Sequence, residues 1–521
     1  MTHTPTAAWW KTAVVYEIYP RSFCDHNGDG IGDLTGIVDH LPYLRHTLGV
    51  DAIWICPFYP SPLLDFGYDV SDFTGVDATL GTLDDFDALI RAAHDLGIRV
   101  LIDYIPNHSA DTHQWFEQAR SSRTNAKRDW YIWADPAADG GPPNNWTSEM
   151  GGSTWEYDEP SGQYYLHSFH SGQPDLNWRN ADLRDAMLDV LRFWLARGVD
   201  GVRIDVAHMI AKDPLLADNP VRAQPRRNDT DRQHADYDTQ VHVNDRLHPD
   251  VHQYLRLIRA VLDEFGARTG RERVAIAEVE VMPWPAWSEF FGADLDGIHL
   301  PFNFSLIEAA WTPRELAAAV EAQEAAVPPG AWPNYVLQNH DRPRLATRIG
   351  EQHVRNAAVL LLTLRGTPTL YYGEELGLAD HPIDRALWRD PLGRDESRAP
   401  MPWTAAAKGG FCRGGVEPWL PAYPDAERVS VEAQLCDPGS VLSLYRDLLA
   451  LRSRMPVLRL GDYAGVQDAP PDCLCFVRRD ATTEVFVALN LGGRPRTVTL
   501  PRPGRVLLTT ASARQAAQHE R

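Results

Sequence analysis

The feature that most constrains the fold of this chain is a repeated unit in which an amphipathic helix precedes a continuous apolar strand. In the clearest example, Thr82 and Asp85 have the spacing of a helix capping box. The apolar residues that follow recur at helical spacing: Phe86, Leu89, Ile90 and Ala93. Gly97 is a suitable helix stop, and the run "IRVLIDYI" follows as a strand buried on both faces would. Such units predict a parallel sheet covered by helices.

Eight apolar runs of this strand type occur along the chain. They begin at Val14, Val50, Arg99, Gly201, Arg273, Gly297, Asn334 and Thr367. A second helical stripe, which includes Met187, Leu191 and Trp194, precedes the strand "VDGVRIDV" in the same way. Eight strands of an α/β protein predict a closed (β/α)8 TIM barrel, with an open doubly wound sheet as the alternative.

The repeat is interrupted twice, and it changes character near the end of the chain. Because single cores stop growing at roughly 250–300 residues, a chain of 521 residues is expected to hold more than one domain. We assign residues 1–105 and 177–455 to the barrel, with an irregular insertion at about 375–438. Residues 106–176, rich in Gly, Pro, Asn and Trp, are predicted to be an inserted subdomain after strand three. Residues 456–521, with the alternating runs "TEVFVALNL" and "RTVTLP", are predicted to be a C-terminal antiparallel β-sandwich domain.

Charge and cysteine content exclude several classes of function. The formal net charge of −21 argues against nucleic acid as a partner, because phosphate binding needs a basic patch. The six cysteines form no CxxC pair and no Cys/His cluster, so we expect no zinc site and free thiols in a reducing compartment. Neither a signal peptide nor an apolar run of membrane-spanning length is visible, which predicts a cytoplasmic protein without a membrane partner.

Charged residues stand at the ends of the predicted barrel strands, where active sites of such barrels lie. Three of them are carboxylates after different strands: Asp205, Glu278 and Asp341. Like charges aimed at one barrel mouth repel and raise one another's pKa, so their grouping favours a chemical role. A pair of carboxylates, one attacking the anomeric carbon and one protonating the leaving oxygen, is what cleavage of a glycosidic bond requires.

At these residues the chain resembles glycoside hydrolase family 13, the α-amylase family, and within it the exo-acting α-glucosidases and oligo-1,6-glucosidases. Five short blocks appear in the family's order: "DYIPNH" from Asp103, "QPDLN" from Gln173, "GVRIDVAH" from Gly201, "AIAEV" from Ala275 and "LQNHD" from Leu337. The resemblance runs from "WWKTAVVYEIYPRSF" to about "RAPMPW" and extends more loosely over the C-terminal domain. Each block is weak alone, whereas all five in order are highly specific.

The resemblance implies the roles of the catalytic residues. Asp205 corresponds to the nucleophile, Glu278 to the general acid/base, and Asp341 to the carboxylate that orients the sugar hydroxyls and stabilises the transition state. Arg203 precedes the nucleophile by two residues, so strand alternation places it on the same face, where its charge favours the ionised nucleophile. His108 and His340 correspond to histidines that bond the sugar in subsite −1.

Further residues are implied to set where the enzyme cuts. Tyr68 would form the aromatic floor beneath the sugar ring, and Phe169 would line the entrance. Asp69 and Arg398 are expected to pair across the pocket and to grip the 4-OH of the non-reducing glucose, which admits only a chain end. Packing inside the inserted subdomain is an equally weighted alternative for Phe169.

The loop "DHNGDGIGD" offers alternating oxygen ligands with glycines for a sharp turn, a pattern that suits a hard cation. The expected ligands are Asp25, Asn27, Asp29, the Ile31 carbonyl and Asp33. The loop is not an EF-hand, because Gly36 stands where the bidentate Glu would be. It resembles the structural Ca2+ site of family 13 α-glucosidases, with Mg2+ as an alternative ion and solvated acids in an Asn/Gly turn as the other interpretation.

Together these features predict a retaining α-glucosidase that releases glucose from short α-glucosides such as maltose, isomaltose or sucrose, and that also transfers glucose. A sugar isomerase or transglucosylase of the sucrose isomerase or trehalose synthase type is the alternative, because it would share the glucosyl-enzyme intermediate. Val206, directly after the nucleophile, is the residue type that accompanies α-1,6 activity in relatives, but the following "AHMI" departs from that pattern. The linkage preference and the oligomeric state stay open.

Overall fold

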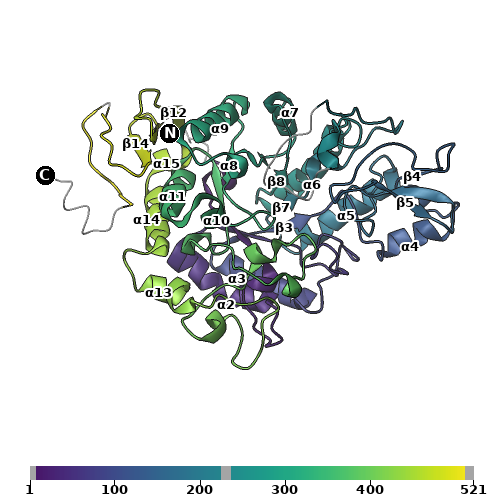
Figure 1. Ribbon diagram of the computed structural model, residues 1–521, viewed down its shortest axis with the longest axis horizontal. Helices are drawn as coiled ribbons and strands as arrows, with labels where there is room; N and C mark the ends of the chain where they lie inside the picture. The colour runs from purple at the N-terminus through teal and green to yellow at the C-terminus, as the bar shows by residue number, and fades with distance from the viewer. Residues whose placement is uncertain (1–6, 224–235, 501, 511–521) are drawn as a thin grey trace.

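A computed structural model describes residues 7–223, 236–500 and 502–510 of the chain. Its centre is a sheet of eight parallel strands (Figure 1). These are β1 (Val15–Ile18), β2 (Ala52–Ile55), β3 (Arg99–Tyr104), β7 (Gly201–Ile204), β8 (Val274–Glu278), β9 (Leu300–Phe302), β10 (Asn334–Val336) and β11 (Thr367–Tyr371). Each lies within one of the eight predicted runs, so the prediction of the strands is confirmed.

The strand order identifies the sheet as a barrel rather than an open doubly wound sheet. Neighbours follow the chain in the cyclic order β10-β11-β1-β2-β3-β7-β8-β9, so β1 pairs with both β2 and the last strand, β11. A doubly wound sheet would instead reverse its order at a switch point. The two edge strands, β9 and β10, lie next to each other without a recorded strand pairing, so the barrel is nearly closed.

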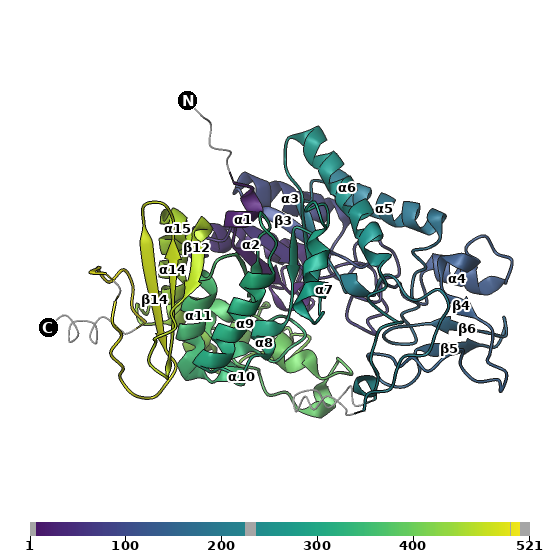
Figure 2. The same cartoon turned by 90° about the horizontal axis from the view of Figure 1, so that it is seen from above.

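Helices surround the barrel (Figure 2), and the longer ones contribute buried apolar residues to its core. The longer ones are α2 (Leu34–Pro42), α3 (Leu83–Asp95), α5 (Ala181–Ala196), α6 (Val251–Thr269), α9 (Pro313–Ala326), α11 (Val354–Thr363) and α14 (Val441–Arg454). Shorter ones are α1 (Trp9–Thr12), α7 (Trp284–Ser288), α8 (Ser305–Glu308), α10 (Leu345–Ile349), α12 (Ala426–Val429), α13 (Val431–Leu435) and a π-helix, η2 (Tyr43–Leu48). None of the described helices is both long and apolar enough to cross a bilayer.

The predicted start and stop of α3 are confirmed in atomic detail. The hydroxyl of Thr82 accepts a hydrogen bond from the Asp85 N–H, and the carboxylate of Asp85 accepts one from the Thr82 N–H at 2.9 Å. These two bonds satisfy donors that the first helical turn leaves free. Gly97 ends the unit with φ at 73°, a left-handed conformation that glycine adopts without a Cβ clash.

Residues 106–176 contain a small antiparallel sheet beside the barrel. It consists of β4 (Trp133–Ala134), β6 (Gln163–Leu166) and β5 (Trp155–Asp158), with α4 (Gln114–Ser121) packed nearby, at the right of Figure 1. A separate cluster of buried apolar side chains, Trp146, Trp155 and Leu166, gives this part its own small core. The chain leaves the barrel after β3 and returns at α5, which suits the predicted inserted subdomain.

The C-terminal part confirms the predicted antiparallel β fold but not the predicted sandwich. Its described residues form one three-stranded antiparallel sheet, β12 (Asp462–Gly465), β13 (Cys473–Arg479) and β14 (Glu484–Asn490), after the short helix α15 (Pro456–Leu460). "TEVFVALNL" contains β14, whereas residues 496–500 of "RTVTLP" form no strand. The expected β-sandwich is therefore wrong for the described residues: one face of the sheet packs on the barrel helices instead of on a second sheet (Figure 2).

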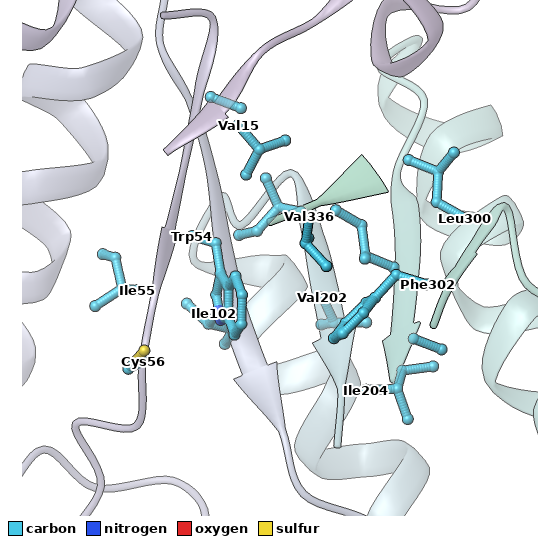
Figure 3. Close-up of a cluster of buried hydrophobic side chains, with 14 of the residues drawn as sticks. Val15, Trp54, Ile55, Cys56, Ile102, Val202, Ile204, Leu300, Phe302 and Val336 are labelled. Carbon is cyan, nitrogen blue, oxygen red and sulfur yellow. The ribbon is translucent and has the colours of Figure 1, made fainter. Parts of the chain in front are cut away.

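Aromatic and aliphatic side chains of several strands fill the barrel beneath the strand ends (Figure 3). Trp54 of β2 and Phe302 of β9 are both almost completely buried. Their rings flank the guanidinium of Arg203, whose carbon lies 5.1 Å from one ring centroid and 5.9 Å from the other. The barrel core thus holds one arginine in a fixed position directly below the pocket.

Candidate active site

A pocket of about 430 Å³ opens at the carboxyl ends of the barrel strands. It is lined by all three predicted catalytic carboxylates and by three of the predicted substrate-binding residues: Asp205, Glu278, Asp341, Tyr68, His108 and Phe169. Arg203 and His340 are completely buried and contact these residues from below. Asp69 and Arg398 do not line the pocket.

Arg203 connects the two carboxylates that were predicted to perform the chemistry. Its Nη1 donates to Asp205 Oδ1 at 2.6 Å, and its Nη2 donates to Glu278 Oε2. Nη1 also donates to Asp103 Oδ1 at 2.8 Å. Directly after Asp205, Val206 has a φ of 34°, which is strained for a β-branched residue and ends β7 at the pocket wall. One buried cation thus fixes the orientation of two carboxylates on neighbouring strands.

The same environment raises the pKa values of both carboxylic acids. Burial is the largest cause in each case, and the charge of Arg203 opposes it. The pKa of Asp205 rises to about 7 and that of Glu278 to about 8; in addition to burial, nearby carboxylates raise both values. The raised pKa of Glu278 suits a protonated acid, while the charge of Arg203 lowers the pKa of Asp205 toward the ionised form that a nucleophile needs.

Asp341 has the opposite pKa shift. Burial would raise the pKa of this carboxyl, but the neighbouring side chains of His340, Arg394 and Arg398 together hold it below the usual range. Because burial lowers the pKa of His340 to about 3, the charge at neutral pH comes from the two arginines. Arg394 Nη1 and Arg398 Nη2 donate to Asp341 Oδ1 at 3.0 and 3.1 Å. Asp341 is thus fixed as an anion in the pocket wall.

His340 lies at the centre of a buried polar chain behind the pocket. Its Nε2 is 2.8 Å from the hydroxyl of Tyr68, and the two rings are stacked with an interplanar angle of 3°. Its Nδ1 is 2.6 Å from Glu17 Oε1, on β1. The thiol of Cys56 contacts both Glu17 and His340, at 3.6 and 3.8 Å. Sequence reasoning identified Tyr68 and His340 but missed Glu17 and Cys56.

His108 and Phe169 join the inserted subdomain to the pocket. His108 Nε2 is 3.1 Å from the side-chain amide of Gln173, and the rings of His108 and Phe169 are 5.2 Å apart. Lys212 supports this wall from behind, with Nζ 2.6 Å from Asp175 Oδ2 and 2.7 Å from Asn107 Oδ1. Phe169 therefore faces the pocket as well as packing within its subdomain.

The predicted pairing of Asp69 with Arg398 is wrong. Asp69 is completely buried and accepts hydrogen bonds from the Ser61 hydroxyl and from the N–H groups of Leu64 and Asp65, so it folds its own loop. Arg398 donates to Asp341 and to the carbonyl of His340.

A different pair lies in the pocket wall: Arg394 Nη2 donates to Asp65 Oδ1 at 2.6 Å, and both residues line the pocket. The blocks "DFGYD" and "LGRDESR" each contain two residues of the required charge. In the sequence, the spacing of Asp65 three residues before Tyr68 could have favoured Asp65 over Asp69. A tight turn with this spacing lets the side chains of Asp65 and Tyr68 both reach the pocket. Asp390 also binds Arg394, through Oδ2 to Nε at 2.7 Å, and it too was missed.

The oxygens of the predicted Ca2+ loop accept hydrogen bonds from the loop itself. Asp25 accepts from Gly28 and Gly30, Asp33 accepts from His26, Asn27 and Gly36, and Asn27 and Asp29 accept from residues two positions on. Within the described residues, the three aspartates do not gather their oxygens within 4.8 Å of one another; the group that does so is Glu17, Cys56 and His340. The carboxylate and amide oxygens of the loop are of the kind that a hard cation binds, but in this structure they accept hydrogen bonds from backbone N–H groups.

Comparison with known proteins places the chain within a family. The model of the α-amylase catalytic domain matches residues 17–461. A probable α-glucosidase of Rhizobium meliloti is 42% identical over 95% of this chain and 92% of its own length. An oligo-1,6-glucosidase of Heyndrickxia coagulans is 35% identical over 93% of this chain and 92% of its own.

Solved structures agree in fold over nearly the whole chain. An α-glucosyl transfer enzyme superposes with a TM-score of 0.90 at 39% identity, covering 96% of this chain and 94% of its own. A trehalulose synthase superposes with a TM-score of 0.87 at 32% identity, covering 97% and 96%. Since the family model covers nearly the whole barrel and every carboxylate of the pocket, the chain belongs to the α-amylase family of glycoside hydrolases.

Proposed function

We propose that this chain is a retaining α-glucosidase that removes single glucose units from the non-reducing end of short α-glucosides. The observation that carries the proposal is the pocket in which Asp205, Glu278 and Asp341 meet, with the ion pair of Asp65 and Arg394 in its wall. We propose that this pair closes one side of the pocket. Relatives with matching lengths have the names α-glucosidase and oligo-1,6-glucosidase, which supports the same activity.

The chemistry follows from the two carboxylates that Arg203 holds. Asp205 attacks the anomeric carbon, and Glu278 transfers its proton to the glycosidic oxygen as that bond breaks, so the aglycone leaves as an alcohol. The product of this step is a β-glucosyl ester of Asp205. Glu278, now ionised, then takes a proton from water, and the resulting attack releases α-glucose and regenerates both groups. Asp341, held as an anion, stabilises the positive charge that develops on the sugar ring.

The acceptor of the second step decides between hydrolysis and transfer. Attack by the hydroxyl of another sugar in place of water yields a new glucoside. Attack by a different hydroxyl of the sugar that has just been released yields an isomer of the substrate. Similarity to an α-glucosyl transfer enzyme and to a trehalulose synthase favours transglucosylation as a second activity of the same intermediate. Analysis of the products at low and at high sugar concentration distinguishes the two outcomes.

One assay tests the proposed function. Initial rates are measured on maltose, isomaltose, sucrose, trehalose and nitrophenyl α-glucoside, with NMR detection of the first anomer formed. We expect hydrolysis of at least one disaccharide with α-glucose as the first product. Appearance of β-glucose first would show inversion, and rapid cleavage inside an end-blocked maltoheptaoside would show an open cleft.

We further propose that the loop from Asp25 to Asp33 would hold one structural Ca2+, or Mg2+, through Asp25, Asn27, Asp29, the Ile31 carbonyl and Asp33. Gly28 and Gly30, with φ values of 86° and 90°, allow the sharp turn that such a ligand set needs. The ion would stabilise the loop and take no part in the reaction. We also propose a cytoplasmic location, which the six free cysteines support because thiols persist in a reducing compartment.

A further inference from the structure

The buried network of polar side chains behind the pocket contains the carboxyl group of Glu17, whose protonation state has consequences for catalysis. Glu17, His340 and Cys56 are all completely shielded from solvent. Among the described residues, no lysine or arginine forms an ion pair with Glu17. Its Oε1 contacts His340 Nδ1 and Cys56 Sγ, and its buried Oε2 has no hydrogen-bond partner. An ionised carboxylate with one bare buried oxygen is costly, whereas the carbonyl oxygen of a neutral acid is tolerated at lower cost.

The two nitrogens of His340 have different neighbours, and this fixes where the ring proton must be. Burial keeps the imidazole neutral, so only one nitrogen carries a proton. Nε2 lies 3.2 Å from Asp341 Oδ2 and 2.8 Å from the Tyr68 hydroxyl. A lone pair on Nε2 would face the anionic oxygen of Asp341 and be repelled, whereas an N–H there is attracted. The proton therefore belongs on Nε2, which leaves Nδ1 as an acceptor.

An acceptor at Nδ1 requires a donor 2.6 Å away, and Glu17 Oε1 is the atom at that distance. We propose that Glu17 is a protonated carboxylic acid that donates to His340 Nδ1 and so holds His340 in the Nε2–H tautomer. Burial raises the pKa of Glu17 well above its usual range, and the charges of Asp341 and Asp103 raise it further against the effect of Arg203. Glu17 is thus a positioning residue: it acts on the sugar only through His340, Tyr68 and Asp341.

The other hydrogen bonds of this buried polar network have directions that agree with the Nε2–H tautomer. With Nε2 as the donor, the Tyr68 hydroxyl accepts, and it donates in turn toward Asp103 Oδ2 at 3.4 Å. Asp103 also accepts hydrogen bonds from Trp54 and from Arg203, so the network ends at a carboxylate that one neutral and one charged donor stabilise. The opposite tautomer would place a Tyr68 proton on Nε2 and leave Asp341 beside a nitrogen without a proton.

The tautomer is measured directly by NMR of protein with selectively 15N-labelled histidine, with His340 assigned by substitution. We expect the Nδ1 resonance of His340 at the position of an unprotonated imidazole nitrogen. A protonated Nδ1 would overturn the proposal. This measurement needs no substrate, so its outcome is independent of whether the proposed α-glucosidase activity, on which the catalytic role of Glu17 rests, is found.

Two substitutions test the positioning role. Glu17→Gln keeps a donor for Nδ1 and replaces a neutral group by a neutral group, so we expect kcat within about threefold of wild type and an unchanged pH profile. Glu17→Met keeps the volume but removes the donor, and kcat should fall on the order of 10²-fold with a smaller change in KM. A shift of the pH limbs in Glu17→Gln would show that a charge had been removed. Full activity of a folded Glu17→Met variant would show that the contact positions nothing.

Discussion

Removal of the Arg394 side chain tests the closure of the pocket. The guanidinium binds three carboxylates: Asp65 at 2.6 Å, Asp390 at 2.7 Å and Asp341 at 3.0 Å. Truncation of one member of a buried, hydrogen-bonded charge pair costs about 2–5 kcal/mol. Asp341 keeps Arg398 as a partner at 3.1 Å and is 29% exposed, so we place the loss at the lower end, about 2–3 kcal/mol. Since about 1.4 kcal/mol is a factor of ten, kcat/KM of Arg394→Ala should fall about 30- to 150-fold.

The assay is the initial rate on maltose or on nitrophenyl α-glucoside, whichever is the better substrate. Arg389→Ala is the matched control, because it removes the same charge from an exposed position of the same loop and should change kcat/KM less than twofold, or about 0.4 kcal/mol. Both kcat and KM should change in Arg394→Ala, since a displaced ring weakens binding and attack geometry together. Equal activity of the two variants would refute the closure of the pocket by Arg394 and Asp65.

Three further predictions follow from the site and the loop. Asp205→Asn should abolish turnover, whereas Glu278→Gln should still form a glucosyl adduct with a substrate whose leaving group needs no proton; turnover in Asp205→Asn would exclude it as the nucleophile. Activity should fall above pH of about 8, as Glu278 loses the proton it donates, and should fall at low pH as Asp205 becomes protonated. The alkaline limb should disappear in Glu278→Gln with an activated aryl glucoside, and its persistence would assign that limb to another group. Chelation by EDTA should lower the Tm more than the initial rate at 25 °C, because a ligand of the folded state stabilises by mass action. An unchanged Tm, with no metal by elemental analysis, would exclude the Ca2+ site.

The strands and their cyclic order could be predicted because local patterns encode them. Apolar runs mark strands that are buried on both faces, and the helical stripes between them leave a barrel as the regular solution for eight strands. The prediction of a strand at "RTVTLP" was wrong, because alternation of apolar and polar residues indicates a half-buried surface but not which strand would pair with it. Whether such a run joins a sheet is decided by tertiary contacts that the sequence pattern does not contain.

The site was predictable where one strand places the residues and unpredictable where two distant loops meet. Arg203 and Asp205 share a strand face, so their contact follows from alternation. Asp65 and Arg394 are 329 positions apart, and the neighbouring Asp69 and Arg398 have the same charges. Only the turn at Asp65 and the other contacts of Asp69 decide which pair forms. Glu17 is similar: its partner His340 is 323 positions away, across the barrel.

The central claim, that Asp205 forms a covalent intermediate while Glu278 supplies and removes the proton, is tested most directly by peptide mapping. Glu278→Gln is mixed with α-glucosyl fluoride, quenched in acid, digested with pepsin and analysed by mass spectrometry. The account predicts one glucosyl group per chain, attached to the peptide that contains "GVRIDVAH", and no adduct in the double variant with Asp205→Asn. An adduct on another residue, or hydrolysis of the fluoride to β-glucose without any adduct, would contradict it.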